Sequence, residues 1–234
     1  MAGANSLSAF YTAPMRKLAM CLLMLLLCPS GAAQSMRGDT AYRMTLLRAA
    51  PGRLLDLVAA LRSSGVVSRS LLLRHAQGDH WDLMLLTPSE PGARLEPVAE
   101  EALVSWQEDE IVRGPDLAKL EPFQGATLIH AEMFHALAGK RAELVKEREM
   151  ENAYLRALGR PTNAIFVRGS GASWDTFTLG PYRSWKHYAE RDDIPREKSA
   201  EAAKAAGFQS EEHIGPYLRS LLLDHHDSLL TRVK

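Results

Sequence analysis

A tryptophan–aspartate motif occurs twice in the chain, and this repeat constrains the fold more than any other feature. Residues 78–88 read G-x-x-W-D-x-x-x-L-x-P around Trp81, and residues 171–181 read the same pattern, without a gap, around Trp174. Tryptophan is rare here, with 4 in 234 residues, so two in register indicate an internal repeat. The alternative is a chance likeness between two ordinary hairpin strands.

Similar elements are expected around both copies of the motif. A short apolar run precedes each motif and another lies within it, which predicts a β-hairpin in each copy. Apolar residues at helical spacing lie upstream, in 54–61 and 142–158, and predict a helix before each hairpin. A first strand is expected before each helix, in 42–49 and in 126–136. A second helix is expected after each hairpin, near 98–111 and near 182–190.

This element order predicts the fold class. With closing strands expected near 117–123 and 227–233, each copy reads β-α-β-β-α-β, the order of a ferredoxin-like unit. Such a sheet has one bare face, which must be buried against another layer. The sequence therefore predicts an α+β fold. Two tandem units, 40–124 and 125–234, pack sheet to sheet as a pseudo-dimeric α/β barrel with extra C-terminal helices in 194–222.

The element order, the tandem copy and the hairpin-to-helix segment 174–185 resemble the dimeric α/β-barrel (ferredoxin-like) superfamily, in particular its NIPSNAP-like and EthD-like branches. The resemblance covers about residues 40–234. Members of this superfamily include cofactor-free monooxygenases, haem enzymes, isomerases and many proteins with no assigned activity. The resemblance therefore implies a fold and leaves the chemistry open.

The first 33 residues have the pattern of a signal peptide. Arg16 and Lys17 precede an apolar run over 18–28, and small residues up to Ala33 follow. That run is shorter than the ~20 residues that span a bilayer and is typical of a secretory signal with cleavage after Ala33. An uncleaved anchor helix is the alternative. We expect an exported protein, periplasmic or secreted, with no stable membrane anchor after cleavage.

Cysteine placement and charge narrow the possible partners. Both cysteines, Cys21 and Cys28, lie in the leader, so the mature protein would have no disulfide and no thiol nucleophile. The chain carries 28 Lys and Arg against 28 Asp and Glu. A balanced charge argues against nucleic-acid binding, which favours a basic excess. The oligomeric state is left open.

The strand expected in 126–136 carries the candidate catalytic pair. Alternation places His130 and Glu132 on one face of this strand and His135 on the other. A histidine and a carboxylate on one face could form an acid–base pair or ligate a metal. The competing interpretation is a hydrated strand end, and a metal would need a third ligand. No metal site is predicted.

Candidate ligand-binding residues follow the second hairpin. Trp174 lies at the hairpin, while Tyr182, Trp185 and His187 lie on the expected helix near 182–190. Tyr182, Trp185 or His187 could close the mouth of a pocket, whereas the structural alternative is a helix packed on its sheet through aromatic residues. The charged segment 140–151 is predicted to be a solvated helix face.

A second histidine cluster lies near the C-terminus. His225 and His226 stand between Asp224 and Asp227, and adjacent side chains diverge from a regular helix or strand. The cluster therefore favours a helix end or turn over a metal site.

The chain has no nucleophile elbow, Walker loop, zinc-protease motif or dinucleotide fingerprint. We expect a protein of unknown activity that binds a small molecule between its two halves. The alternative is a cofactor-free or haem-dependent enzyme, of oxygenase or isomerase type, acting on a small organic substrate. The cofactor is unknown from sequence.

Overall fold

A computed structural model describes residues 38–90, 94, 96–171 and 174–233. The expected signal peptide and its two cysteines lie outside the described residues. No helix in the described part of the chain combines the length and apolar character needed to cross a bilayer.

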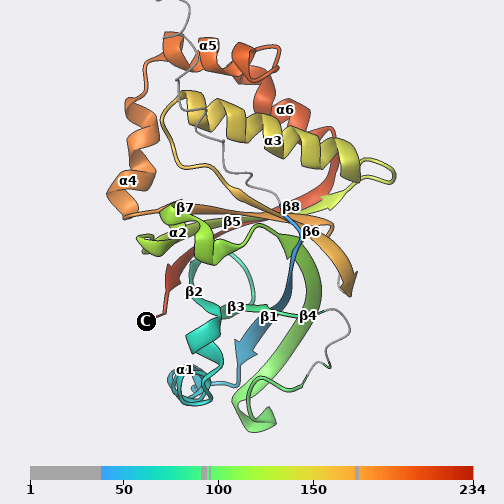
Figure 1. Ribbon diagram of the computed structural model, residues 1–234, viewed down its shortest axis with the longest axis vertical. Helices are drawn as coiled ribbons and strands as arrows, with labels where there is room; N and C mark the ends of the chain where they lie inside the picture. The colour runs from blue at the N-terminus through green and yellow to red at the C-terminus, as the bar shows by residue number, and fades with distance from the viewer. Residues whose placement is uncertain (1–37, 91–93, 95, 172–173, 234) are drawn as a thin grey trace, which may run out of the picture. The chain divides into compact units, whose positions relative to one another are not determined.

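The described chain forms a closed barrel of antiparallel strands in the order β1-β3-β2-β8-β5-β7-β6-β4 (Figure 1). The strands are β1 Thr40–Ala49, β2 Leu71–Gln77, β3 Leu83–Pro88, β4 Val104–Gly114, β5 Leu128–Ala136, β6 Ala164–Gly171, β7 Thr176–Tyr182 and β8 Leu222–Arg232.

Both predicted units have the same internal strand order. The first is β4-β1-β3-β2 and the second is β8-β5-β7-β6, and the β2·β8 and β4·β6 ladders join them. The two sheets therefore meet edge to edge and close one barrel, so that each sheet buries its inner face against the other. This confirms the α+β barrel at the level of architecture.

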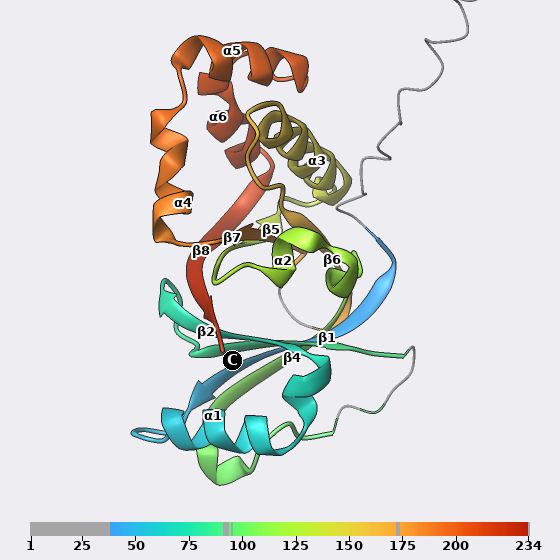
Figure 2. The same ribbon diagram turned by 60° about the vertical axis from the view of Figure 1, so that its left-hand side comes forward.

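Helices cover the outside of the barrel. In both ribbon views α1 lies on one side, and α3, α5 and α6 lie on the opposite side (Figure 2). The helices are α1 Leu54–Ser63, α2 Glu121–Gln124, α3 Arg141–Ala157, α4 Trp185–Ala189, α5 Arg196–Ala205 and α6 Ile214–Arg219.

The helix predicted near 98–111 was wrong. Most of that segment is strand β4, which pairs with β1 over nearly its whole length. The alternation was hidden because polar residues, Glu108 and Glu110, occupy positions on the same face as buried Val112. The closing strand expected near 117–123 was also wrong, since β4 is that strand and 117–124 forms short helical turns.

The last strand begins earlier than predicted. β8 starts at Leu222 and includes the histidine cluster, so the helix end or turn expected at Asp227 was wrong. Leu222, expected in the last helix, belongs to the strand because it pairs with Ala136 of β5.

The two copies of the repeated motif occupy matching positions. In the first, the Asp82 carboxylate accepts the Ala49 N–H at 2.8 Å and the Asp82 N–H donates to the Leu47 carbonyl at 2.8 Å. In the second, the Asp175 carboxylate accepts the Ala136 N–H at 3.0 Å and the Asp175 N–H donates to the Phe134 carbonyl at 3.0 Å. Each aspartate thus fastens a hairpin to the end of the first strand of its unit.

Buried side chains from both units fill the barrel interior. Trp81 and Trp174 belong to the same apolar cluster, together with the ring stack of Phe166 on Phe177, whose centroids are 4.6 Å apart. The space between the two sheets therefore holds packed side chains.

Candidate functional site

Strand β5 divides its side chains between the barrel interior and the helix-covered outer face. Ile129, Ala131 and Met133 point inward and are buried in the central cluster. His130 and Glu132 alternate with them and face outward, toward α3. The predicted pairing of His130 and Glu132 on one face is confirmed, but that face lies away from the space between the halves.

His130 is paired with a carboxylate of the neighbouring strand. Its Nε2 lies 3.6 Å from Oδ1 of Asp227 on β8. Burial disfavours the charged imidazole, but Asp227 and the charges of Glu132 and Glu151 outweigh that effect and raise the pKa of His130. The cationic, proton-donating form of His130 is therefore more favoured than that of a free imidazole.

Arg148 of α3 is the centre of a buried charge network. Its side chain is 1% exposed and contacts three carboxylates. Its Nε lies 2.6 Å from Glu147, and its Nη1 lies 2.8 Å from Glu151 and 3.5 Å from Glu132. The solvated helix face predicted for 140–151 was therefore wrong at these positions. Helical spacing explains why Arg148 is buried, because it lies four residues after buried Leu144 and therefore on the same face of α3.

Two of these carboxylates hold protons more tightly than usual. Burial raises the pKa of Glu151 to about 7 despite the neighbouring charge of Arg148. Burial also raises the pKa of Glu147. His130 and Glu151 each feel the charge of the other. A histidine and a carboxyl group that both have raised pKa values beside one cavity are an arrangement suited to acid–base chemistry.

Aromatic and cationic side chains form the opposite wall. The rings of Tyr182 and Tyr188 meet edge to face at 5.0 Å, and Tyr188 lies 5.7 Å from the His130 imidazole. The Arg160 guanidinium lies 5.6 Å from the Tyr182 ring centre and donates to the carbonyls of His187 and Tyr188. These contacts hold α4 against the segment that follows α3.

A cavity of about 490 Å³ lies between the outer face of β5 and β7 and the helices α3 to α5, and its lining includes His130, Tyr182 and Tyr188. We call it the outer-face pocket. A volume of this size is within the range of small-molecule sites. Its polar lining residues include His130, Glu132, Glu151, Tyr154, Arg160 and Tyr188. Arg160, which follows α3, had no functional signal in the sequence, and Tyr188 of α4 lies on the helix predicted near 182–190 but was not among the candidate site residues.

The predicted ligand-binding residues divide between two places. Tyr182 lines the outer-face pocket, and His187 packs against its ring at 5.6 Å. Trp185 begins α4 with its side chain largely in solvent, 50% exposed. Trp174 lies at one end of the barrel, where its indole stacks on His135 at 4.2 Å. The structure therefore brings Tyr182 and His187 together with His130, and leaves Trp174 apart.

The C-terminal histidines point in different directions from β8. His226 binds Asp79 at 2.9 Å and meets the Trp174 ring at the barrel end. His225 lies 3.6 Å from Asp227 on the outer face. Within the described residues, no three histidine, cysteine, aspartate or glutamate side chains are grouped so that they could hold a metal ion.

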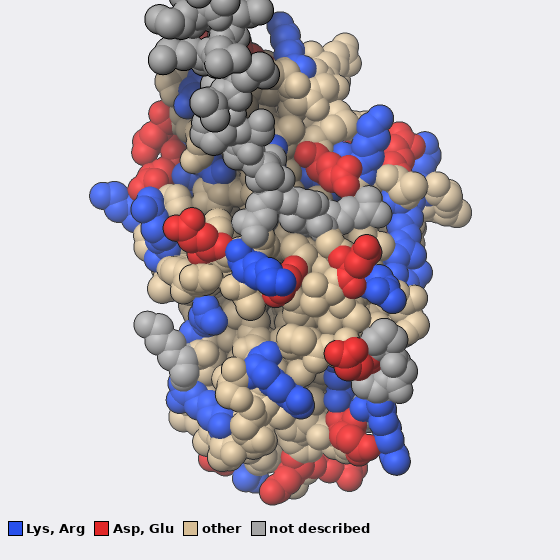
Figure 3. All heavy atoms as spheres, viewed as in Figure 1, with Lys and Arg blue, Asp and Glu red and all other residues tan. Residues whose placement is uncertain are grey.

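The surface carries both signs of charge. Lysine and arginine side chains alternate with aspartate and glutamate over the face in Figure 3, without a continuous basic stripe. This mixture agrees with the balanced composition.

Comparison with known proteins shows the fold. No protein-family model matches the sequence, and no curated protein matches it. The solved structure of an anthrone oxidase-like protein aligns with a TM-score of 0.57 at 11% identity, over 86% of this chain and 94% of that one. A proposed monooxygenase from Lactobacillus acidophilus NCFM aligns with a TM-score of 0.50 at 7% identity, over 83% and 94%. The chain thus has the dimeric α+β barrel fold.

Proposed function

We propose that this protein binds a small organic molecule in the outer-face pocket. The observation that carries the proposal is the position of His130, which borders a cavity of about 490 Å³ and whose Nε2 lies 3.6 Å from the Asp227 carboxylate. An interior packed with side chains leaves no such space beside the predicted residues, so the proposed site lies outside the barrel.

The pocket favours a polar, planar ligand. A cationic imidazole donates a strong hydrogen bond to a phenolate, enolate or carboxylate oxygen. The Tyr188 ring beside His130 offers a surface for an aromatic face. Arg160 is an additional donor among the lining residues. A hydroxylated aromatic compound satisfies all three groups. Anthrone, which the name of the protein with TM-score 0.57 contains, is a planar aromatic ketone whose enol form carries such a hydroxyl group, and it is a reasonable first probe.

The test is a binding titration of the purified chain with anthrone, followed by tyrosine and tryptophan fluorescence. His130→Gln keeps a neutral hydrogen-bonding group but removes the cation. We expect it to weaken binding about tenfold, which is the effect of one charge-assisted hydrogen bond. His213→Gln, which removes a histidine outside this pocket's lining, is the matched control. Equal binding by both variants would contradict the proposal.

An enzymatic role is the second candidate, favoured by the proximity of His130 and Glu151. An imidazole and a carboxyl group beside one cavity could donate a proton to one atom of a substrate and accept one from another. Glu151→Gln should then abolish turnover of a phenolic substrate while the Tm stays within a few degrees. Loss of binding and turnover together would assign Glu151 to ligand binding.

A haem-dependent enzyme fits this pocket poorly. A porphyrin needs apolar faces around its ring, whereas charged and hydroxyl-bearing groups line much of the outer-face pocket. A Soret band that appears when haem is added would contradict this view.

We further propose that the two units arose by tandem duplication, that the chain belongs near the NIPSNAP-like and EthD-like branches, and that it is exported. The matching aspartate contacts support the duplication, and the leader pattern supports export. N-terminal sequencing of the protein recovered from its native host tests export, with Gln34 expected as the first residue.

A further inference from the structure

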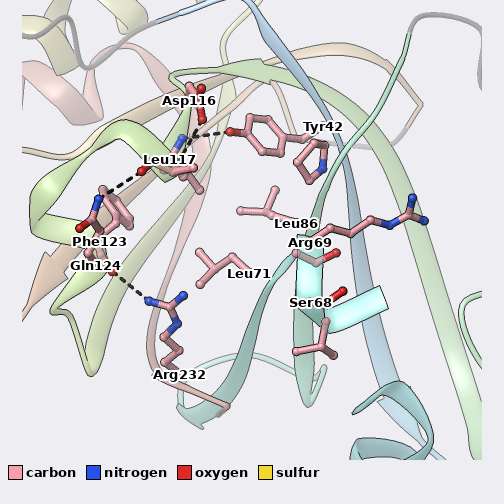
Figure 4. A pocket seen from close by; sticks show the side chains of 14 residues that line it. Tyr42, Ser68, Arg69, Leu71, Leu86, Asp116, Leu117, Phe123, Gln124 and Arg232 are labelled. Carbon is pink, nitrogen blue, oxygen red and sulfur yellow. Dashed lines mark hydrogen bonds between the residues drawn. The ribbon is translucent and has the colours of Figure 1, made fainter. Parts of the chain in front are cut away.

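A second cavity lies at the end of the barrel where β1 begins. Its volume is about 330 Å³, and it lies between the turns that follow α1 and β4 (Figure 4). We call it the barrel-end pocket. Its lining shares no residue with the outer-face pocket.

The wall of the barrel-end pocket is largely apolar. Leu71 and Leu86 pair across β2 and β3, and Leu117 and Phe123 cover them from the segment that follows β4. Figure 4 places these side chains around one hollow. Water in an apolar hollow is readily displaced by an apolar ligand.

Most polar groups of this pocket already have partners. The Tyr42 hydroxyl donates to the Pro115 carbonyl and accepts from the Leu117 N–H, both at 3.0 Å. The Ser70 hydroxyl donates to the Val66 carbonyl at 2.7 Å. These groups therefore contribute little hydrogen bonding to a ligand.

Arg232 differs from them. Its Nη1 donates to the Phe123 carbonyl at 3.0 Å, which holds the guanidinium at the cavity wall. Among the described residues this is its one side-chain hydrogen bond, and a guanidinium has five N–H donors. Asp116, the acidic residue of the lining, lies at the other side of the hollow and is paired with Lys119. The side chain of Arg69 extends away from the hollow.

We propose that the barrel-end pocket binds an amphipathic monocarboxylate, with its hydrocarbon part against Leu71, Leu86 and Phe123 and its carboxylate on Arg232. One fixed cation at one side of an apolar hollow favours a single carboxylate at one end of an apolar body. Asp116 repels a second carboxylate at the opposite side.

The experiment is a ligand-observed NMR titration of the full chain with octanoate and, separately, with 1-octanol. We expect octanoate to bind about tenfold more tightly than 1-octanol. Arg232→Gln should abolish that difference and leave 1-octanol binding unchanged. Ser68→Trp, at an exposed position of the lining, should fill the cavity and prevent binding of both.

Two control variants distinguish this site from others. Arg62→Gln removes an exposed arginine of α1 outside the pocket and should change nothing. Tyr188→Ala, in the outer-face pocket, should leave octanoate binding intact. Equal affinity for octanoate and 1-octanol, or no binding, would overturn the proposal. Loss of octanoate binding in Tyr188→Ala alone would also overturn it, because the ligand would then occupy the outer-face pocket.

Discussion

The outer faces of the two units have the same strand order but carry different side chains. On the first unit, α1 packs Leu57 and Leu61 against leucines of β1, β2 and β3 in an aliphatic layer. On the second unit, α3 buries Arg148 and Glu147 beside a cavity. A layer of aliphatic side chains stabilises a fold, whereas buried charges beside a cavity cost stability and are typical of functional sites.

The two units differ most clearly in the cation that faces an aspartate at matching positions of the last strand. Thr45 pairs with Asp109 across β1 and β4, as Glu132 pairs with Asp227 across β5 and β8. Two residues before Thr45 stands Arg43, and its Nε contacts Asp109 at 2.7 Å.

Two residues before Glu132 stands His130, 3.6 Å from Asp227. The first unit thus holds a permanent cation in a close two-point contact with its carboxylate. The second holds a titratable cation in a looser one, free to take part in binding.

The largest predicted effect is in the second unit. Arg148→Met leaves the buried carboxylates of Glu147 and Glu151 without their cation, so the free energy of unfolding should fall by about 3–5 kcal/mol. Urea denaturation measures this. Arg156→Met, at an exposed position of the same helix, should change stability by less than about 0.5 kcal/mol. Equal effects would remove the distinction between the two faces.

The next prediction concerns the inner face of the first unit. Glu110 of β4 occupies the position that matches Ser228 of β8, because each comes directly after one of the matched aspartates, Asp109 and Asp227. The Glu110 side chain is 1% exposed. Burial, and then the like charge of Glu108, raise the pKa of Glu110 to about 8. The folded chain therefore keeps a proton that the unfolded chain releases near pH 4.5, and stability should fall as the pH rises from about 4.5 to about 8.

Glu110→Gln cannot lose that proton. Above pH 8 the variant should be more stable than the wild type by about 1–3 kcal/mol, since one pKa unit corresponds to about 1.4 kcal/mol. Denaturation across this pH range tests it, with exposed Glu197→Gln as the control. Parallel stability curves for Glu110→Gln and the wild type would show that Glu110 is ionised in the folded chain.

A smaller difference in stability is expected between substitutions of the matched carboxylates Asp109 and Asp227. Asp109→Asn breaks the contact with Arg43 and should cost about 1–2 kcal/mol. Asp227→Asn removes a half-exposed partner and should cost less than about 1 kcal/mol. It should instead lower the pKa of His130, because Asp227 is a cause that raises it. Urea denaturation and histidine NMR titration measure the two quantities. The reverse order of stability losses would break the comparison.

The smallest prediction concerns what the units share. Asp82→Asn weakens a hydrogen bond to a backbone N–H at 2.8 Å, and Asp175→Asn weakens one at 3.0 Å together with the partly exposed ion pair that Asp175 forms with Arg168 at 2.9 Å. Each should lower the free energy of unfolding by about 1 kcal/mol. Thermal unfolding measures both, and a clearly smaller loss for Asp175→Asn than for Asp82→Asn would mean that the repeated motif has different roles in the two units.

Local pattern was enough for some elements and failed for others. The hairpins and first strands were predictable because alternating apolar residues identify strands that face a core. Strand β4 was not predictable in this way, because Glu108 and Glu110 lie on its inward face. The polar inward residues broke the hydrophobic period on which the prediction depends.

The sequence by itself determined the repeat, the element order of the second unit and the shared face of His130 and Glu132, since these follow from residue types and the strand period. Only the tertiary structure decided that this face lies beneath α3, that Arg148 is buried there, that Asp227 pairs with His130, and that Arg160 and Tyr188 border the same cavity as His130. Such contacts join residues far apart in the chain, and their geometry depends on strand register and helix packing, which no local spacing encodes.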